Sequence, residues 1–173
     1  GLLVRANGFT LENLAIEDTR GDAVKVNEGE HITFRQVRVE WTGGSKTSNG
    51  AYGLYPVRTR NVLIEGCVVI GASDAGIYVG QSSDIVVRNN LARGNVAGIE
   101  IENSTHADVY GNEATGNTGG ILVFNMPNLP VPGIGTRVYG NHVHANNTAN
   151  FGAKGSAVAS IPAGSGIVVN SND

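Results

Sequence analysis

The fold is decided by three segments that follow one another at intervals of 22 residues: Gly76-Ile77-Tyr78-Val79, Gly98-Ile99-Glu100-Ile101 and Gly120-Ile121-Leu122-Val123. The same Gly-apolar-x-apolar pattern recurs along the chain at residues 1–4, 53–56 and 166–169, with an Ala-led variant at 23–26. A fixed period of this size is the mark of a repeat architecture, in which each unit adds one structural layer. Longer intervals, of 30 and 46 residues, indicate insertions between some of the units.

Each unit also contains a second run of β-forming residues. These runs lie at residues 9–16, 32–39, 62–69, 85–92, 107–114 and 136–143. A unit of about 22 residues with no helical period is too short for a strand-helix crossover or a propeller blade, but it fits one turn of a parallel β-helix. We therefore predict an all-β fold: a single-stranded parallel β-helix solenoid of about seven coils, forming one domain over residues 1–173. Right-handedness is expected from the general preference of parallel crossovers.

Composition supports this prediction and excludes several other classes. The 25 glycines and 19 asparagines favour turns and disfavour long helices. The net charge of −3 argues against nucleic acid or an anionic membrane as a partner, and no apolar run is long enough to insert in a membrane. One cysteine, Cys67, cannot form an internal disulfide. No cofactor-binding motif is present, so no cofactor is predicted.

Alternation along the first strand of each unit sorts its side chains into rows. Two inward rows are predicted, one of them formed by Leu2, Val24, Leu54, Ile77, Ile99, Ile121 and Ile167, and the other two residues further on. Two asparagine ladders are also expected, at Asn90, Asn112 and Asn141 and at Asn95, Asn117 and Asn146. Cys67 falls in the first of these ladders, one unit before Asn90, and is expected to be a small buried residue.

Three insertions, at residues 41–52, 126–133 and 147–165, flank the first strand of the units that carry them. Insertions in solenoids commonly border the binding face, although simple variation in loop length accounts for them equally well. The chain starts within a strand motif and stops within a coil. We therefore expect the domain to be part of a longer solenoid, or its ends to be covered by a partner or by end-to-end self-association.

The segments 52–56, 71–82 and 98–103 resemble the right-handed parallel β-helix repeat family of exported bacterial proteins, within the pectin-lyase-like superfamily. This resemblance implies an exported protein, periplasmic or extracellular, and reinforces the right-handed fold. The superfamily includes lyases, hydrolases, epimerases and binding scaffolds, so the resemblance does not choose an activity. The Asn-Thr-Asp and Gly-His-Gly blocks of polygalacturonases and the Asp-Pro-His block of alginate epimerases do not occur here, so no family catalytic residue can be transferred.

The candidate site is the outward face of the first strands, where Lys25, Tyr55, Tyr78 and Glu100 should lie in register on successive coils. Its candidate catalytic residues are Asp74, Glu100, Tyr78 and Lys25, and its candidate substrate-binding residues are Tyr55, Arg58, Glu102 and Asp22. Aromatic rings pack on sugar faces, and charged groups bind hydroxyl or uronate groups. For a lyase or epimerase, Lys25, Tyr55 or Tyr78 would be the base. We expect both Glu100 and Glu102 to be exposed.

These residues predict a module that binds an extended polysaccharide, with lyase, epimerase or hydrolase chemistry left open. A separation of about 10 Å between Asp22 and Asp74, two coil spacings, disfavours a hydrolase built on that pair. A non-catalytic scaffold that presents loops to a protein partner in an envelope complex is the alternative. His142 and His144, with Glu113 one coil away, are interpreted as polar surface positions, and no metal site is predicted.

Overall fold

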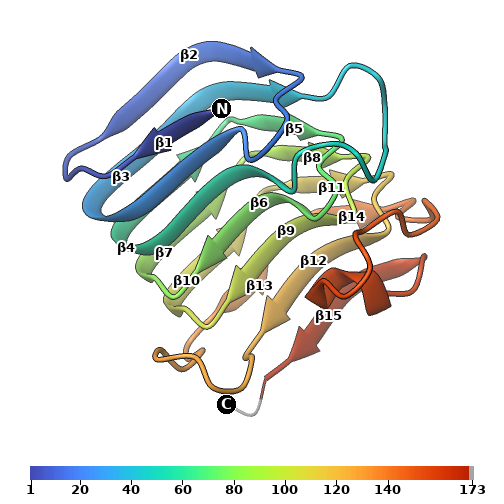
Figure 1. Ribbon diagram of the computed structural model, residues 1–173. Coiled ribbons are helices and arrows are strands. Elements are labelled where there is room, and N and C mark those ends of the chain that lie inside the picture. The colour runs from blue at the N-terminus through green and yellow to red at the C-terminus, as the bar shows by residue number, and fades with distance from the viewer. Residues whose placement is uncertain (172–173) are drawn as a thin grey trace.

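The computed structural model describes residues 1–171 as a stack of coils in which every strand pairing is parallel (Figure 1). One ladder of strands, here called the first ladder, contains β1 (Leu2–Val4), the starts of β3 (Val24–Glu40) and β4 (Tyr52–Glu65), then β6 (Ala75–Gly80), β9 (Ala97–Glu102), β12 (Gly119–Phe124) and β15 (Ser165–Asn170). Its seven strands confirm the predicted solenoid of about seven coils.

Two further ladders complete each coil. The second ladder contains β2 (Thr10–Glu17), the continuations of β3 and β4, β7 (Ser83–Arg88), β10 (Thr105–Tyr110) and β13 (Arg137–Tyr139). The third contains the ends of β2 and β3, then β5 (Val68–Ile70), β8 (Leu91–Arg93), β11 (Glu113–Thr115) and β14 (His142–His144). The ends of the described chain lie at opposite ends of the stack (Figure 1).

The register of the first ladder matches the sequence period. Leu54 pairs with Ile77, Ile77 with Ile99, and Ile99 with Ile121, so the inward row forms one continuous column. These four side chains are fully buried. Each buried aliphatic side chain of this kind contributes about 1.5–3 kcal/mol to the free energy of unfolding. Because every coil adds such side chains, the interior is the main source of stability.

The second runs at 9–16 and 32–39 each fall on a single strand, as predicted, but the four later runs do not. Each of those four splits into two strands at a sharp corner, where Gly66, Asn89, Gly111 and Gly140 adopt positive φ angles of 50–65° at equivalent places of successive coils. Glycine and asparagine tolerate this left-handed conformation, which ends one strand and turns the chain into the next. The later coils therefore carry a separate third-ladder strand after a glycine or asparagine corner, whereas β2 and β3 continue through the equivalent positive-φ residues Asn13 and Gln36.

Both asparagine ladders are confirmed. In one of them, Asn117 Oδ1 accepts hydrogen bonds from the backbone N–H of Asn95 at 2.9 Å and from Asn95 Nδ2 at 3.1 Å, while Asn117 Nδ2 donates to Ala92 O at 3.0 Å. Asn146 then accepts the corresponding bonds from Asn117. Cys67 begins the other ladder, where its N–H donates to Asn90 Oδ1 at 2.8 Å and burial raises the pKa of its thiol to about 11.

The first and third insertions are anchored to the stack by buried side chains, Trp41 in the interior apolar cluster and Val158 outside it. Trp41 is buried and its Nε1 donates to Thr19 O at 2.7 Å, while Asn49 Nδ2 in the first insertion donates to Gly71 O at 2.7 Å. The third insertion contains the short 3₁₀ helix η1 (Ala157–Ser160), and its Val158 joins a second apolar cluster with Leu122 of the first ladder. The described residues 1–171 include no helix with the length and apolar character needed to cross a membrane.

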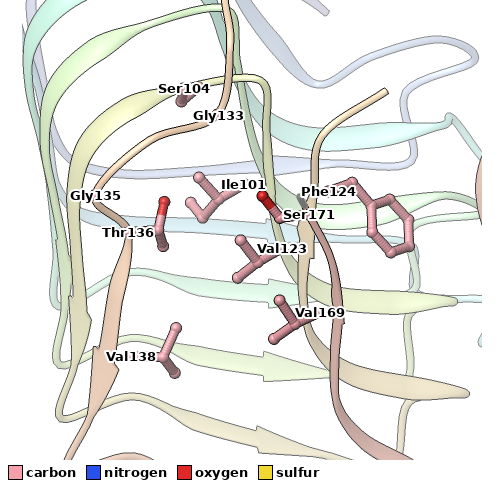
Figure 2. Close-up of a pocket in the computed structure, with 10 residues that line it drawn as sticks. All are labelled: Ile101, Ser104, Val123, Phe124, Gly133, Gly135, Thr136, Val138, Val169 and Ser171. Carbon is pink, nitrogen blue, oxygen red and sulfur yellow. The ribbon is translucent and has the colours of Figure 1, made fainter. Parts of the chain in front are cut away.

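The interior opens at the C-terminal end of the stack. Ile167 and Val169, the inward-facing residues of β15, are 51% and 65% exposed. Beside them lies a cavity of about 480 Å³ whose lining includes Ile101, Val123 and Val138 (Figure 2). This cavity is the unfilled end of the apolar interior, and its lining does not include the candidate site residues.

Replacing Asn117 with Ala should lower the free energy of unfolding by about 3 kcal/mol, because it leaves two buried donors of Asn95 and the Ala92 carbonyl without partners. Urea denaturation followed by circular dichroism measures the change. Asn147→Ala, at an exposed position beside the ladder residue Asn146, is the control and should change stability by less than about 0.5 kcal/mol. Equal losses in the two variants would show that the ladder bonds do not stabilise the fold.

Candidate functional site

Three tyrosines meet on the outward face of the first ladder. The ring centroids of Tyr52 and Tyr55 are 4.4 Å apart, those of Tyr52 and Tyr78 are 4.8 Å apart, and Tyr55 meets Tyr78 edge to face at 4.9 Å. They are surrounded by Asp74, Glu100 and Glu102, whose charges act on the rings and on one another. We call these six residues the tyrosine–carboxylate cluster.

A glycine makes room for the central tyrosine. Tyr78 and Gly80 lie on the same side of β6, and a Cβ at Gly80 would stand 2.3 Å from the Tyr78 hydroxyl. The ring therefore folds across Gly80, which pairs with Glu102 on the next strand, and the Tyr78 hydroxyl donates to Glu102 Oε1 at 2.8 Å. The absence of a side chain at residue 80 thus permits a hydrogen bond between neighbouring coils.

Asp74 sits at the corner that leads into β6. Its backbone is held from both sides, because its N–H donates to Ala51 O at 3.0 Å and its carbonyl accepts from Ala97 N at 2.7 Å. The side chain is 8% exposed. Burial, together with the charges of Glu102 and Asp22, raises the pKa of Asp74 to about 7, against a hydrogen bond from Tyr52 that lowers it. Asp74 can therefore accept or release a proton near neutral pH.

Glu100 is buried, contrary to the sequence-based expectation. It is 2% exposed and lies in register between Tyr78 and Leu122, in a part of the face where Leu122 packs with Val158 and Ile161 of the third insertion. Burial first, and then the charges of Asp74 and Glu102, raise the pKa of Glu100 well above its ordinary value. Among the described residues, Glu100 Oε2 has no hydrogen-bond partner. Glu102 is half-buried, so the expectation of full exposure is wrong for it as well.

The same surroundings disfavour tyrosine as a base. Burial raises the pKa of Tyr52, Tyr55 and Tyr78, and the charges of the nearby carboxylates raise them further. Tyr78 is 5% exposed and its proton is directed to Glu102. The three hydroxyls therefore stay protonated at neutral pH and act as hydrogen-bond donors, so the surroundings do not favour Tyr55 or Tyr78 among the predicted bases Lys25, Tyr55 and Tyr78.

The remaining predicted residues lie at the edges of the cluster. Lys25 Nζ stands 4.4 Å from the centroid of the Tyr55 ring, in a cation–π contact, and pairs in register with that residue. Asp22 is half-buried, and burial raises its pKa while the charge of Lys25 lowers it. Both Asp22 and Lys25 line a cavity of about 270 Å³. The cluster therefore has a partly open end on the Lys25 side.

Arg58 lies outside the cluster. It occupies the corner after the first ladder with a φ of 54°, is exposed, and binds Asn27 Oδ1 at 2.8 Å and Glu28 at 3.3 Å. It lines a corner cavity of about 650 Å³, whose wall includes Pro130 of the second insertion. The insertion at 126–133, expected from the sequence to flank the first ladder, thus borders the corner that follows this ladder, beside Arg58.

Comparison with protein-family models gives a match over residues 1–173 to a family described as the right-handed β-helix region. The chain belongs to the right-handed β-helix family. Comparisons with curated proteins and with solved structures gave no significant match. The parallel β-helix predicted from the 22-residue period is confirmed, as is the right-handedness expected from parallel crossovers and from family resemblance.

Two residues of the β-helix site, Tyr52 and Gly80, were not predicted from the sequence. Tyr52 pairs in register with Ala75, and this column continues through Ala97 and Gly119. An aromatic residue in a column of small residues was the available signal. No sequence signal marks Gly80, because this residue matters only through the Tyr78 ring that packs across it.

The raised pKa of Asp74 predicts a pH-dependent stability. An acid that binds its proton more tightly in the folded state stabilises the fold below its folded pKa, and this contribution is lost as the pH rises from about 4 through about 7. Relative to Asp74→Asn, the parent should lose up to about 4 kcal/mol of unfolding free energy between pH 4 and pH 8. Chemical denaturation across this range measures the difference.

Relative to Glu100→Gln, the parent should also lose unfolding free energy as the pH rises. The neutral amide resembles the protonated carboxyl and removes the cost of ionising it. Glu17→Gln, at an exposed position of β2, is the control and should follow the parent at each pH. A pH-independent gap between the parent and both cluster variants would mean that these carboxyls ionise freely in the folded protein.

Proposed function

We propose that the chain binds an extended polysaccharide along the outward face of the first ladder, and that Asp74 transfers a proton in a lyase or epimerase reaction on that polymer. One observation carries the proposal. A packed group of tyrosines, with Tyr52 and Tyr55 half-buried, adjoins a carboxyl whose pKa is about 7. Aromatic rings supply a platform for sugar rings, and a group that titrates near neutral pH supplies acid–base chemistry.

The open side of the cluster favours a ligand that enters from the N-terminal coils. Leu3, Lys25 and Tyr55 share one outward column and are exposed or half-buried, whereas Tyr78, Glu100 and Leu122 are buried. A chain of sugars lying along this column would contact the accessible part of Tyr55 and reach Asp74 at its inner end. Coil spacing of about 4.8 Å is close to the length of a sugar residue, which suits an extended polymer parallel to the axis.

The proposed chemistry begins with removal of a proton. The ionised Asp74 carboxylate takes the proton from the carbon beside a uronate carboxylate, and the Lys25 ammonium offsets the negative charge that develops there. In lyase chemistry the electron pair left by that proton forms a carbon–carbon double bond, the bond to the glycosidic oxygen breaks, and the leaving oxygen takes up the proton from the protonated Asp74. In epimerase chemistry the glycosidic bond stays intact and water supplies a proton to the opposite face of the same carbon, while the protonated Asp74 returns its proton to solvent. Tyr52 donates to Asp74 and fixes the orientation of the carboxyl.

A protein-binding scaffold is the second candidate, and burial of the C-terminal half of the same face favours it. Val158 and Ile161 of the third insertion pack on Leu122 of the first ladder. The outer surface of this part of the ladder is therefore formed by the insertion loop. Loops held on a rigid stack are suited to presentation to a partner. Under this alternative the tyrosine–carboxylate cluster would be a structural link between coils.

Tyr55→Ala should weaken polysaccharide binding by about 1–2 kcal/mol, roughly five- to thirty-fold in Kd, through loss of aromatic contact. A glycan array identifies the polymer, and calorimetric titration measures the change. Tyr139→Ala is the matched control, because Tyr139 is 47% exposed and stacks on Tyr110 of the second ladder. Loss of affinity in the control alone would place binding on the second ladder, and absence of any glycan ligand would favour the scaffold.

Asp74→Asn should abolish turnover while leaving polysaccharide binding within a few-fold of the parent, because the amide keeps the shape of the carboxyl but cannot take up the proton. Formation of unsaturated products from uronate polymers, followed by ultraviolet absorbance, tests the lyase reaction, and NMR of the polymer tests epimerisation. The rate for the parent should rise with pH through about 7, where Asp74 ionises. Unchanged turnover in Asp74→Asn would remove this residue from the mechanism.

A further inference from the structure

A separate group of metal-binding side chains lies on the third ladder. His142 and His144 are two residues apart on β14, so both project outward while Val143 between them contacts the apolar interior. Their rings are stacked with centroids 4.0 Å apart. Glu113 of β11 pairs in register with His142, which brings its carboxylate beside the two imidazoles.

The donor atoms of these three residues already converge. One ligand atom from each of Glu113, His142 and His144 lies within 4.8 Å of the others, and among the described residues this is the one group of three or more such side chains with that property. His144 Nε2 lies 3.1 Å from Glu113 Oε1. The 3.1 Å separation matches that between ligands that share one ion, since metal–ligand bonds of about 2.0–2.2 Å place neighbouring donors about 3–3.5 Å apart.

The ring of His144 also has an outer partner. Thr115 Oγ1, on the strand next to β14, lies 3.4 Å from His144 Nδ1. Histidine ligands commonly use their second ring nitrogen in this way, because the hydrogen bond fixes the tautomer and the ring orientation. In the tautomer in which Nδ1 donates to Thr115 Oγ1, Nε2, the atom that faces Glu113, is unprotonated and can bind a cation.

We propose that Glu113, His142 and His144 bind one divalent transition-metal ion of the zinc or copper class. Two imidazoles and a carboxylate match the preferences of these ions, whereas Ca²⁺ and Mg²⁺ prefer oxygen ligands alone. Two of the donors sit on one rigid strand and the third on its hydrogen-bonded neighbour, so small side-chain rotations close the site. Arg93, in register with Thr115 on the far side from β14, adds a positive charge nearby that limits the affinity.

The location of the site determines the solvent access of a bound ion and the strands that the ion would link. Glu113 and His144 side chains are 48% and 41% exposed, so a bound ion keeps at least one coordination position open to solvent. It would also tie β11 to β14, the last strand of the third ladder among the described residues. Because the ion binds the folded protein, it should raise the temperature of unfolding. This site is on a different ladder from the tyrosine–carboxylate cluster and is independent of the proposed polysaccharide site.

The test is titration of the metal-free protein with Zn²⁺ by calorimetry, with Co²⁺ absorption as a spectroscopic readout of imidazole ligation. We expect one ion per chain, and His142→Ala and His144→Ala should each weaken Zn²⁺ binding at least ten-fold, as should Glu113→Gln. Metal binding competes with protons for the imidazole nitrogens, so affinity should also fall in acid. His106→Ala, an exposed histidine on the second ladder, is the matched control and should bind Zn²⁺ like the parent.

Thermal unfolding separates metal binding from folding. Without metal, the three site variants should unfold within about 2 °C of the parent because the altered side chains are on the surface. With Zn²⁺, the parent and His106→Ala should be stabilised, and the double variant His142→Ala/His144→Ala should not. Absence of Zn²⁺ binding by the parent, or equal binding and stabilisation of the double variant, would overturn the proposal.

Discussion

The structure depends on the parallel, in-register stacking of each coil on the next. Strand hydrogen bonds maintain this register along the flat parts of a coil, but each corner exposes backbone groups that no strand can pair. The asparagine ladders supply the missing partners. Each amide accepts from a backbone N–H of the preceding coil and donates to a backbone carbonyl of that same coil, and it also donates to the amide oxygen of the next coil. With the corners fixed in this way, a residue at a given place in one coil lies directly beside its counterpart in the next.

Such stacking turns a sequence period into columns of like position, and the columns explain both candidate sites. On the first ladder, the column that passes through Lys25, Tyr55, Tyr78 and Glu100 brings aromatic rings and a carboxyl together. On the third ladder, the pairing of β11 with β14 brings Glu113 beside two histidines. The two groups differ in burial. The first group is partly enclosed, and burial raises the pKa values of its carboxyls Asp74 and Glu100. The second group is open to solvent.

Burial of Glu100 and Asp74 is costly unless both can be protonated or hydrogen-bonded. The hydroxyls of Tyr52 and Tyr78 provide donors to Asp74 and Glu102, but Glu100 Oε2 is left without a partner among the described residues. A stack held together by apolar columns does not need such a group on its outer face. Polar groups that lower stability in an otherwise consistent fold commonly mark the places where function is located.

The inward rows, the asparagine ladders and the outward column could be predicted because they recur with the period of the coil. Features without that period could not. The split of the four later second runs could not be predicted either, although its corner residues recur once per coil, because a single asparagine or glycine such as Asn89 or Gly111 inside a β-forming run does not by itself indicate a left-handed turn. Burial of Glu100 depends on how the insertion at 147–165 folds back over Leu122, which no repeated pattern records. Export to the periplasm or cell exterior, implied by family resemblance, stays a prediction.

The central claim is that stacking of the coils encloses an acid with a pKa near neutrality on the outward face of the first ladder. Carbon-13 NMR titration of the aspartate side-chain carboxyls tests it most directly. The account predicts one aspartate resonance with a midpoint near pH 7 that disappears in Asp74→Asn. A spectrum in which every aspartate carboxyl titrates below about pH 5, as in model peptides, would contradict it.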